Sequence, residues 1–263
     1  MAGHTTVGTV AWEAQGGPPL SLYQKAGLLL GYGSILTANL MTRFWLLVSR
    51  RFPLEGKDAA RHLDLEAWAP PDSQIARDAE EYAREFSSIA MVNHCYRTYY
   101  FAALMYEQSK TKTRMDKEAL YVASILHDVG LFQSKRPQGE HCFTVGSASV
   151  ARRIAKSAGW DSARVDGVAE AIMLNLNPWV PLQKYGPEAH FMSVGGQLEV
   201  LAQYWKVPPD DSREILARYP RADFASDSSL HVKNEARQNP GSRFGCLCPL
   251  YTFFVPKLAF KVT

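Results

Sequence analysis

The feature that most constrains the fold is a long series of segments whose apolar residues recur every three or four positions. Such spacing is typical of helices that bury one face, and no strand-like alternation competes with it in the middle of the chain. The sequence predicts helices over residues 73–86, 88–108, 116–129, 146–158, 161–176 and 188–205. We therefore expect an all-α fold, a helical bundle.

The chain divides into three parts on this pattern. Its 263 residues, 46% of them apolar, are enough for one large domain with a substantial core. We predict an N-terminal extension over 1–72, a helical domain over 73–224 and an irregular C-terminal tail over 225–263 packed on that domain. The tail is read as irregular because prolines precede it and its sequence is aromatic without clear periodicity.

The extension contains one apolar run, AGLLLGYGSILTANLMTRFWLLV at residues 26–48. Asn39, Arg43 and several glycines interrupt the run, and a central arginine costs several kcal/mol in a bilayer. This argues against a membrane span. We expect an extra apolar helix that packs against the domain or takes part in a dimer contact.

Charge and cysteine content exclude several classes of protein. The net charge is only +3, and the basic residues are dispersed, which does not favour a nucleic acid or a membrane surface as partner. Without a secretory signal at the N-terminus, we expect a cytoplasmic protein with four free cysteines. No glycine-rich phosphate loop follows a strand, so no organic cofactor is expected.

The pattern that points to chemistry is the dipeptide His127-Asp128 at the predicted end of a helix. Adjacent helical residues point about 100° apart, so both side chains reach one ion only near a helix end. The sequence before them, ALYVASIL, is apolar, so we expect the pair to be buried. A buried carboxylate needs a hydrogen-bond partner or a cation beside it. His94 lies on the preceding predicted helix and could face His127 across a helical hairpin. Two histidines that are hydrogen-bonded core residues remain an alternative to a metal site.

Several ordered blocks strengthen the metal interpretation: NHCYRTYY, ALYVASILHDVGLF, FTVGSASVARRIA, AIMLNLNPWV and EAHFMSVGGQLEVLAQYW. Together they resemble the HD-domain superfamily, most closely its fungal branch of cyanamide hydratase-like proteins. The resemblance implies an HD-type helical bundle, a divalent metal such as zinc or iron, and hydration or hydrolysis by metal-bound water. It assigns His94, His127 and Asp128 as metal ligands and Glu199 as a fourth ligand, at a position where the family normally has aspartate.

Two positions depart from the hydratase-like pattern. Asn175 stands where a histidine is usual, and asparagine cannot take a proton near neutral pH. Thr144 stands where glutamate is common. With Asp128, these two residues are our candidate catalytic residues, and His141 is a fourth, since it could supply the proton-transfer group that Asn175 lacks. The alternative, which the residues alone favour, is that His141 is a surface loop residue.

Three functions remain open on the sequence. The first is a metal-dependent hydro-lyase or hydrolase that acts on a small organic electrophile. The second is a repurposed biosynthetic enzyme, of the kind found in fungal secondary metabolism, that dehydrates, isomerises or cyclises a larger apolar metabolite with or without metal. The third is a non-enzymatic binding protein that keeps the fold. A small-molecule partner is expected in each case, and a homo-oligomer is one option.

Overall fold

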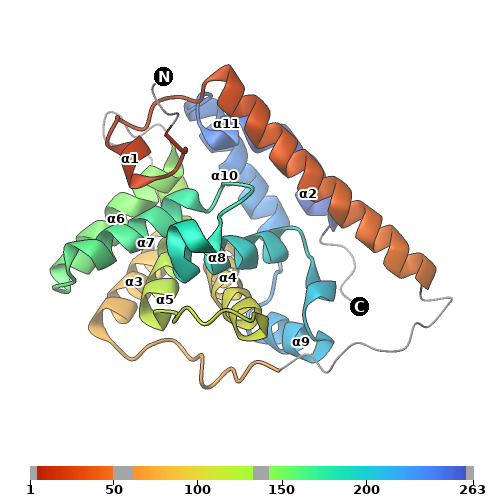
Figure 1. Cartoon of the computed structure of the whole chain (residues 1–263), viewed down its shortest axis with the longest axis horizontal. Coiled ribbons are helices and arrows are strands. Elements are labelled where there is room, and N and C mark those ends of the chain that lie inside the picture. The colour runs from red at the N-terminus through yellow and green to blue at the C-terminus, as the bar shows by residue number, and fades with distance from the viewer. Residues whose placement is uncertain (1–4, 50–61, 133–141, 259–263) are drawn as a thin grey trace.

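The computed structural model describes residues 5–49, 62–132 and 142–258, and within these ranges the regular structure is entirely helical. Figure 1 shows the arrangement of the helices. They are α1 (Val10–Glu13), α2 (Leu22–Ser49), α3 (Gln74–Phe86), α4 (Ile89–Gln108), α5 (Lys117–Leu126), α6 (Phe143–Ser157), α7 (Ser162–Leu174), α8 (Leu182–Val200), α9 (Pro209–Arg218), α10 (Phe224–Gln238) and α11 (Arg243–Leu258), with short 3-10 turns η1 (Val129–Phe132) and η2 (Tyr204–Lys206). The prediction of an all-α fold with an extra N-terminal helix is confirmed.

Polar caps explain why several predicted helices begin within a residue of their observed positions. Ser73, Ser88, Asp116 and Asp161 each accept a hydrogen bond from a backbone N–H in the first turn of the helix that follows. Such a cap satisfies a donor that has no partner within the helix, which fixes the starting residue. The starting residues of α3, α4, α5 and α7 therefore follow from local sequence, whereas α5 and α7 end at Leu126 and Leu174, earlier than the predicted 129 and 176.

The centre of the bundle is α4, whose middle part is buried on all sides and packs against α8. Gly195 on α8 permits this contact. A Cβ atom at that position would lie 2.6 Å from the Ala102 nitrogen and 2.7 Å from the Thr98 carbonyl oxygen. Both distances are too short for any side chain, so the two backbones touch only because position 195 is glycine.

Helix α2 lies along one edge of the bundle beside α11 (Figure 1). The polar residues that interrupt its apolar run face the body: the Asn39 amide donates to the Leu201 carbonyl at 3.2 Å. Arg43 donates to the carbonyls of Leu201 at 3.2 Å, Ala202 at 2.9 Å and Leu258 at 3.4 Å. Arg43 therefore joins α2 to the C-terminal ends of both α8 and α11. None of the described helices is long and apolar enough to cross a membrane.

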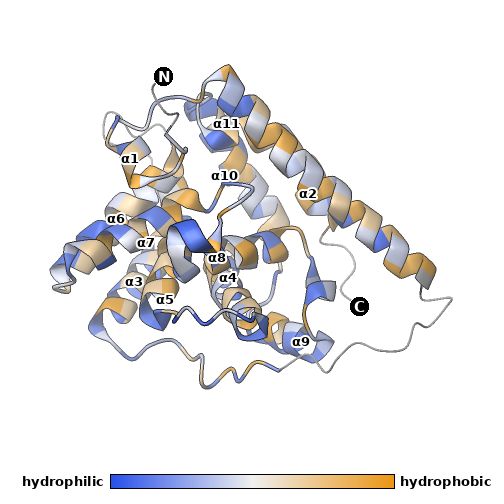
Figure 2. Ribbon diagram, viewed as in Figure 1, coloured by the Kyte–Doolittle hydropathy of each residue, from blue (hydrophilic) through white to orange (hydrophobic). Residues whose placement is uncertain are grey.

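The side of α2 that faces away from the body is also hydrophobic, as its colouring in Figure 2 shows. Leu30 is 75% exposed, and Met41, Phe44 and Trp45 are each more than half exposed. The helix thus has apolar residues around its whole circumference, with one stripe buried against the domain and the rest open to solvent.

The prediction of an irregular tail after residue 224 is wrong for the part that the structure describes. Residues 224–238 form α10 and residues 243–258 form α11. In α11 the residues Phe244, Leu247, Tyr251, Phe254 and Leu258 follow a three- and four-residue spacing, a helical stripe that Pro249 and Pro256 obscured. Pro209 likewise begins α9 rather than breaking the chain, because a first-turn proline has no N–H bond to lose.

Candidate metal centre and its pocket

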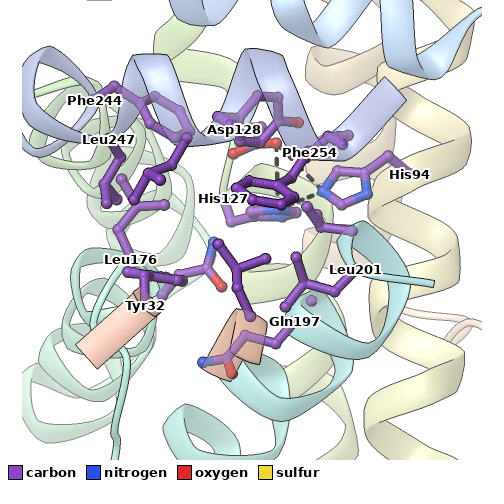
Figure 3. A pocket seen from close by; sticks show the side chains of 17 residues that line it. Tyr32, His94, His127, Asp128, Leu176, Gln197, Leu201, Phe244, Leu247 and Phe254 are labelled. Atoms are coloured by element: carbon purple, nitrogen blue, oxygen red, sulfur yellow. Dashed lines mark hydrogen bonds and ion pairs between the residues drawn. The ribbon is translucent and has the colours of Figure 1, made fainter. Parts of the chain in front are cut away.

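Three side chains from two helix regions meet in the interior, as predicted: His94 from the middle of α4, His127 at the C-cap of α5, and Asp128 directly after it. All three are buried. The Nε2 atoms of the two histidines lie 3.3 Å apart. The Asp128 Oδ2 atom lies 3.4 Å from the His127 Nε2 and 3.5 Å from the His94 Nε2 (Figure 3).

The outer nitrogen of each imidazole fixes its tautomer. The His127 Nδ1 lies 2.6 Å from the Ser124 carbonyl oxygen, which can only accept, so Nδ1 carries the proton. The His94 Nδ1 lies 2.6 Å from the Glu199 Oε2, a carboxylate oxygen that also accepts. In the neutral imidazoles both Nε2 atoms are therefore unprotonated, and their lone pairs converge with the Asp128 oxygen. Three electron-rich atoms in contact repel one another unless a cation lies between them.

The spacing of the three atoms fits a transition-metal site. Nitrogen and oxygen ligands lie about 2.0–2.2 Å from zinc in a tetrahedral arrangement, which separates any two of them by about 3.3–3.5 Å. The three observed separations of 3.3, 3.4 and 3.5 Å lie in this range. Two imidazoles with one carboxylate are ligands that suit zinc or iron. His94, His127 and Asp128 therefore could hold one divalent ion with a further position open to the pocket.

Burial also favours the ligand form of His127. Loss of hydration lowers the pKa of this imidazole, although the neighbouring Asp128 charge acts in the opposite direction. A neutral imidazole is the form that donates a lone pair to a metal.

Glu199 lies outside this group of three, which differs from its expected place as a fourth ligand. Its carboxylate lies against the opposite nitrogen of His94, and it also accepts from the Arg97 Nε at 2.7 Å and from an Arg221 nitrogen at 2.9 Å. Glu199 and Arg97 are fully buried. Burial alone would raise the pKa of the Glu199 carboxyl, but the charges of Arg221 and Arg97 hold it well below its usual range. Glu199 thus contacts the Nδ1 atom of His94 and orients this candidate metal ligand, instead of being a ligand itself.

The three residues lie at one end of a cavity of about 90 Å³ (Figure 3). Asn175, at the C-cap of α7, lies in its wall as predicted, together with Gln197 of α8. The remaining lining is mostly hydrophobic and comes largely from α2 and α11: Tyr32, Leu36, Leu176, Val200, Leu201, Phe244, Leu247, Leu250, Tyr251, Phe254 and Val255, with Gly196 between.

Thr144, a predicted catalytic residue, is not among the residues that line this cavity. It is fully buried elsewhere and accepts a hydrogen bond from Arg243, whose guanidinium also contacts the Asn177 side-chain oxygen at 3.1 Å. The hydroxyl therefore serves a buried arginine rather than the pocket. Cys142 belongs to the same cluster, 3.7 Å from Arg243. His141 lies outside the described residues.

The sequence analysis did not identify two parts of the site: Arg221 and the hydrophobic lining from α11. Arg221 follows α9 and pairs with Glu199, but nothing in its local sequence indicates that a buried carboxylate lies opposite. The α11 wall had a usable signal, the apolar stripe described above, which the two prolines concealed. Cys95, which follows His94 on α4, is buried, and this burial raises the pKa of its thiol well above its usual range.

Comparison with known proteins gives a family match that spans this site and two more distant curated relatives. A family model for the HD domain matches residues 91–219, which include His94, His127, Asp128 and Glu199. Two curated relatives from Saccharomyces cerevisiae, the cyanamide hydratases DDI2 and DDI3, are each 27% identical over 105 residues. The match covers 40% of this chain and 47% of each relative, so the chain spans about half the length of the curated relatives it matches.

Proposed function

The chain belongs to the HD-domain superfamily, and on that premise we propose that it is a metal-dependent hydratase or hydrolase of small organic molecules. The observation that carries the proposal is the convergence of the His94 Nε2, the His127 Nε2 and the Asp128 Oδ2, three atoms without a proton between them, at the end of a cavity. Similarity to two proteins named cyanamide hydratases supports addition of water as the reaction type.

Each residue near the cluster has a distinct task in this proposal. His94, His127 and Asp128 would hold the ion, and the Ser124 carbonyl and Glu199 keep the two imidazoles in the tautomer that binds metal. The chemistry that a divalent ion supplies in such a site is a lowered pKa of water, toward about 7. Asn175 offers an amide group that would orient a polar substrate group by hydrogen bonds, whereas the Gln197 amide nitrogen already donates to the Pro178 carbonyl at 3.3 Å.

The substrate that this arrangement suits has an electrophilic carbon that lies beside the polar end of the cavity. Proton transfer to the leaving or product atom falls to Asp128, because Asn175 cannot change its protonation state near neutral pH. Asp128 is slightly exposed to the cavity, whereas Glu199 is fully enclosed by its two arginines.

A second candidate is a repurposed enzyme that dehydrates, isomerises or cyclises a larger apolar metabolite. The observation that favours it is the hydrophobic lining from α2 and α11, which exceeds what a small polar substrate needs. In that case the same cluster could act through acid–base chemistry alone.

Metal content is the decisive measurement for the first candidate. We expect about one equivalent of zinc or iron per chain in the purified protein by elemental analysis, and its loss in His127→Ala. His190→Ala is the matched control, since the His190 Nδ1 contacts the Val180 carbonyl at 2.7 Å and His190 does not belong to the cluster. Equal metal content in wild type and His127→Ala, or no metal in wild type after reconstitution, would contradict the proposal.

A further inference from the structure

We propose that α2 and α11 form a binding wall for the hydrocarbon body of the substrate, so that the enzyme acts on uncharged electrophiles that carry an apolar group. This inference rests on the proposed function and adds a substrate class to it. Cyanamide, the compound in the names of the two relatives, has no hydrocarbon part that could use such a wall.

Separation of polar and apolar lining is the first observation. His94, His127 and Asp128 lie together on one side of the cavity, with Phe254 and Leu201 beside them, and the side away from them is lined by Tyr32, Leu176, Phe244 and Leu247 (Figure 3). A ligand that spans the cavity must therefore have a polar end and an apolar end. Only the polar end could reach the metal-binding atoms.

The charge of the lining is the second observation. Among the described residues that line the cavity, Asp128 is the one carboxylate, and no lysine or arginine takes part. The nearby guanidinium groups of Arg97 and Arg221 are already engaged by Glu199. A phosphate or carboxylate on the substrate would meet no counter-charge in this lining, whereas a neutral molecule would lose little hydration on entry.

The origin of the wall is the third observation. Tyr32 and Leu36 of α2 and six residues of α11 lie outside the segment 91–219 that matches the HD domain. The metal-binding atoms and the apolar wall thus come from different parts of the chain. Substrate choice can differ from that of other HD-domain proteins while the ligand set is kept.

The wall is also held in a fixed position relative to the cluster. Arg43 binds the carbonyl groups at the ends of α8 and α11, and the Leu201 that it contacts lies in the cavity lining. A pre-formed apolar surface binds a hydrocarbon chain without first paying an ordering cost. Tyr32 is uncharged at neutral pH, as a phenol ordinarily is, and burial raises its pKa further, to about 12.

A series of straight-chain alkyl hydroxamates, from acetohydroxamate to octanohydroxamate, tests the wall by calorimetric titration of the metal-loaded protein. Their head group binds metals, and their chains differ by one methylene each. We expect the dissociation constant to fall about fourfold per added methylene until the cavity is full. A dissociation constant that does not change with chain length would overturn the proposal.

Two substitutions on α2 locate the effect. Leu36→Trp narrows the cavity from its wall and should lower the chain length at which the gain per methylene stops. Leu30→Trp is the control, because Leu30 is 75% exposed on the same helix and does not line the cavity. If Leu36→Trp does not fold, Leu247→Ala takes its place, because it enlarges the cavity. Binding affinity should then increase up to a longer hydroxamate chain than in wild type. An unchanged chain-length limit would contradict the proposal that α2 and α11 bind the hydrocarbon chain.

The same series separates this inference from the proposed function. In His127→Ala, weaker binding at every chain length with an unchanged gain per methylene supports both proposals. If affinity rises with each added methylene but depends neither on metal nor on His127, the metal-dependent mechanism is refuted and the proposed hydrocarbon-binding wall stands. Metal-dependent binding with no gain per methylene would refute the wall alone.

Discussion

Glu199→Gln tests how the buried network behind His94 supports both the fold and the site. The substitution keeps the shape of the side chain but removes the one charge that two buried guanidinium groups share. Arg97 is fully buried and Arg221 nearly so, and both donate to the Glu199 Oε1, at 2.7 and 2.9 Å. The neutral amide also offers a weaker acceptor to the His94 Nδ1.

Removal of one member of a buried ion pair typically costs about 3–5 kcal/mol, because the remaining charge is left without compensation. For a domain of this size, that corresponds to a decrease in melting temperature of about 6 to 20 °C. Loss of a partner that orients a metal-binding histidine typically lowers metal affinity about 10- to 100-fold. We expect both effects in Glu199→Gln.

Urea unfolding gives the free energy of unfolding, and competition with a chelating dye gives the metal affinity. Glu214→Gln is the control, since the Glu214 carboxylate pairs with Arg218 at 3.7 Å on the surface and such pairs contribute about 0–1 kcal/mol. A loss below about 1 kcal/mol in Glu199→Gln would refute the view that its charge is required by the two arginines. Unchanged metal affinity would refute its orienting role toward His94.

Three further substitutions test how the bundle is assembled. Arg43→Met should lower the free energy of unfolding, measured by urea titration, by about 1–3 kcal/mol, because several backbone carbonyl groups lose a charged hydrogen-bond donor. An unchanged free energy of unfolding would mean that α2 packs on the domain by apolar contacts alone. Gly195→Ala should destabilise the protein by about 1–3 kcal/mol, because the added Cβ atom clashes with the backbone of α4. Gly167→Ala is the control: the space around Gly167 is open, and the substitution should stabilise the protein by about 0.5–1 kcal/mol. Equal melting temperatures of the two variants would contradict the close approach of α8 and α4. Asp116→Ala should cost about 0.5–2 kcal/mol at pH 7. Burial raises the pKa of Asp116, but hydrogen bonds from Arg164 and the first turn outweigh it and lower the pKa, so the stabilisation is present above about pH 4 and is lost as the pH falls. A difference from wild type that persists in acid would exclude the carboxylate as its source.

Local sequence was sufficient for the starting residues of several bundle helices and for the three residues that meet at the candidate site. Periodicity and polar caps act within a few residues, so the starting residues of α3, α4, α5 and α7 could be predicted closely. The pair His127-Asp128 was recognisable because it follows an apolar helix at its predicted end, although α5 ends at Leu126 and the predicted terminating glycine, Gly130, lies within η1. His94 joined it by the ordinary rule that consecutive helices pack side by side.

The tertiary structure alone decided what surrounds these residues. Whether Glu199 coordinates a metal or orients His94 depends on where Arg97 and Arg221 lie, and the latter approaches from a distant part of the chain. The hydrophobic wall likewise needs α2 and α11 to meet over the polar cluster, although they are at opposite ends of the sequence. Local patterns report which residues form a helix and which face is apolar, but the partner that buries this face is set by long-range packing.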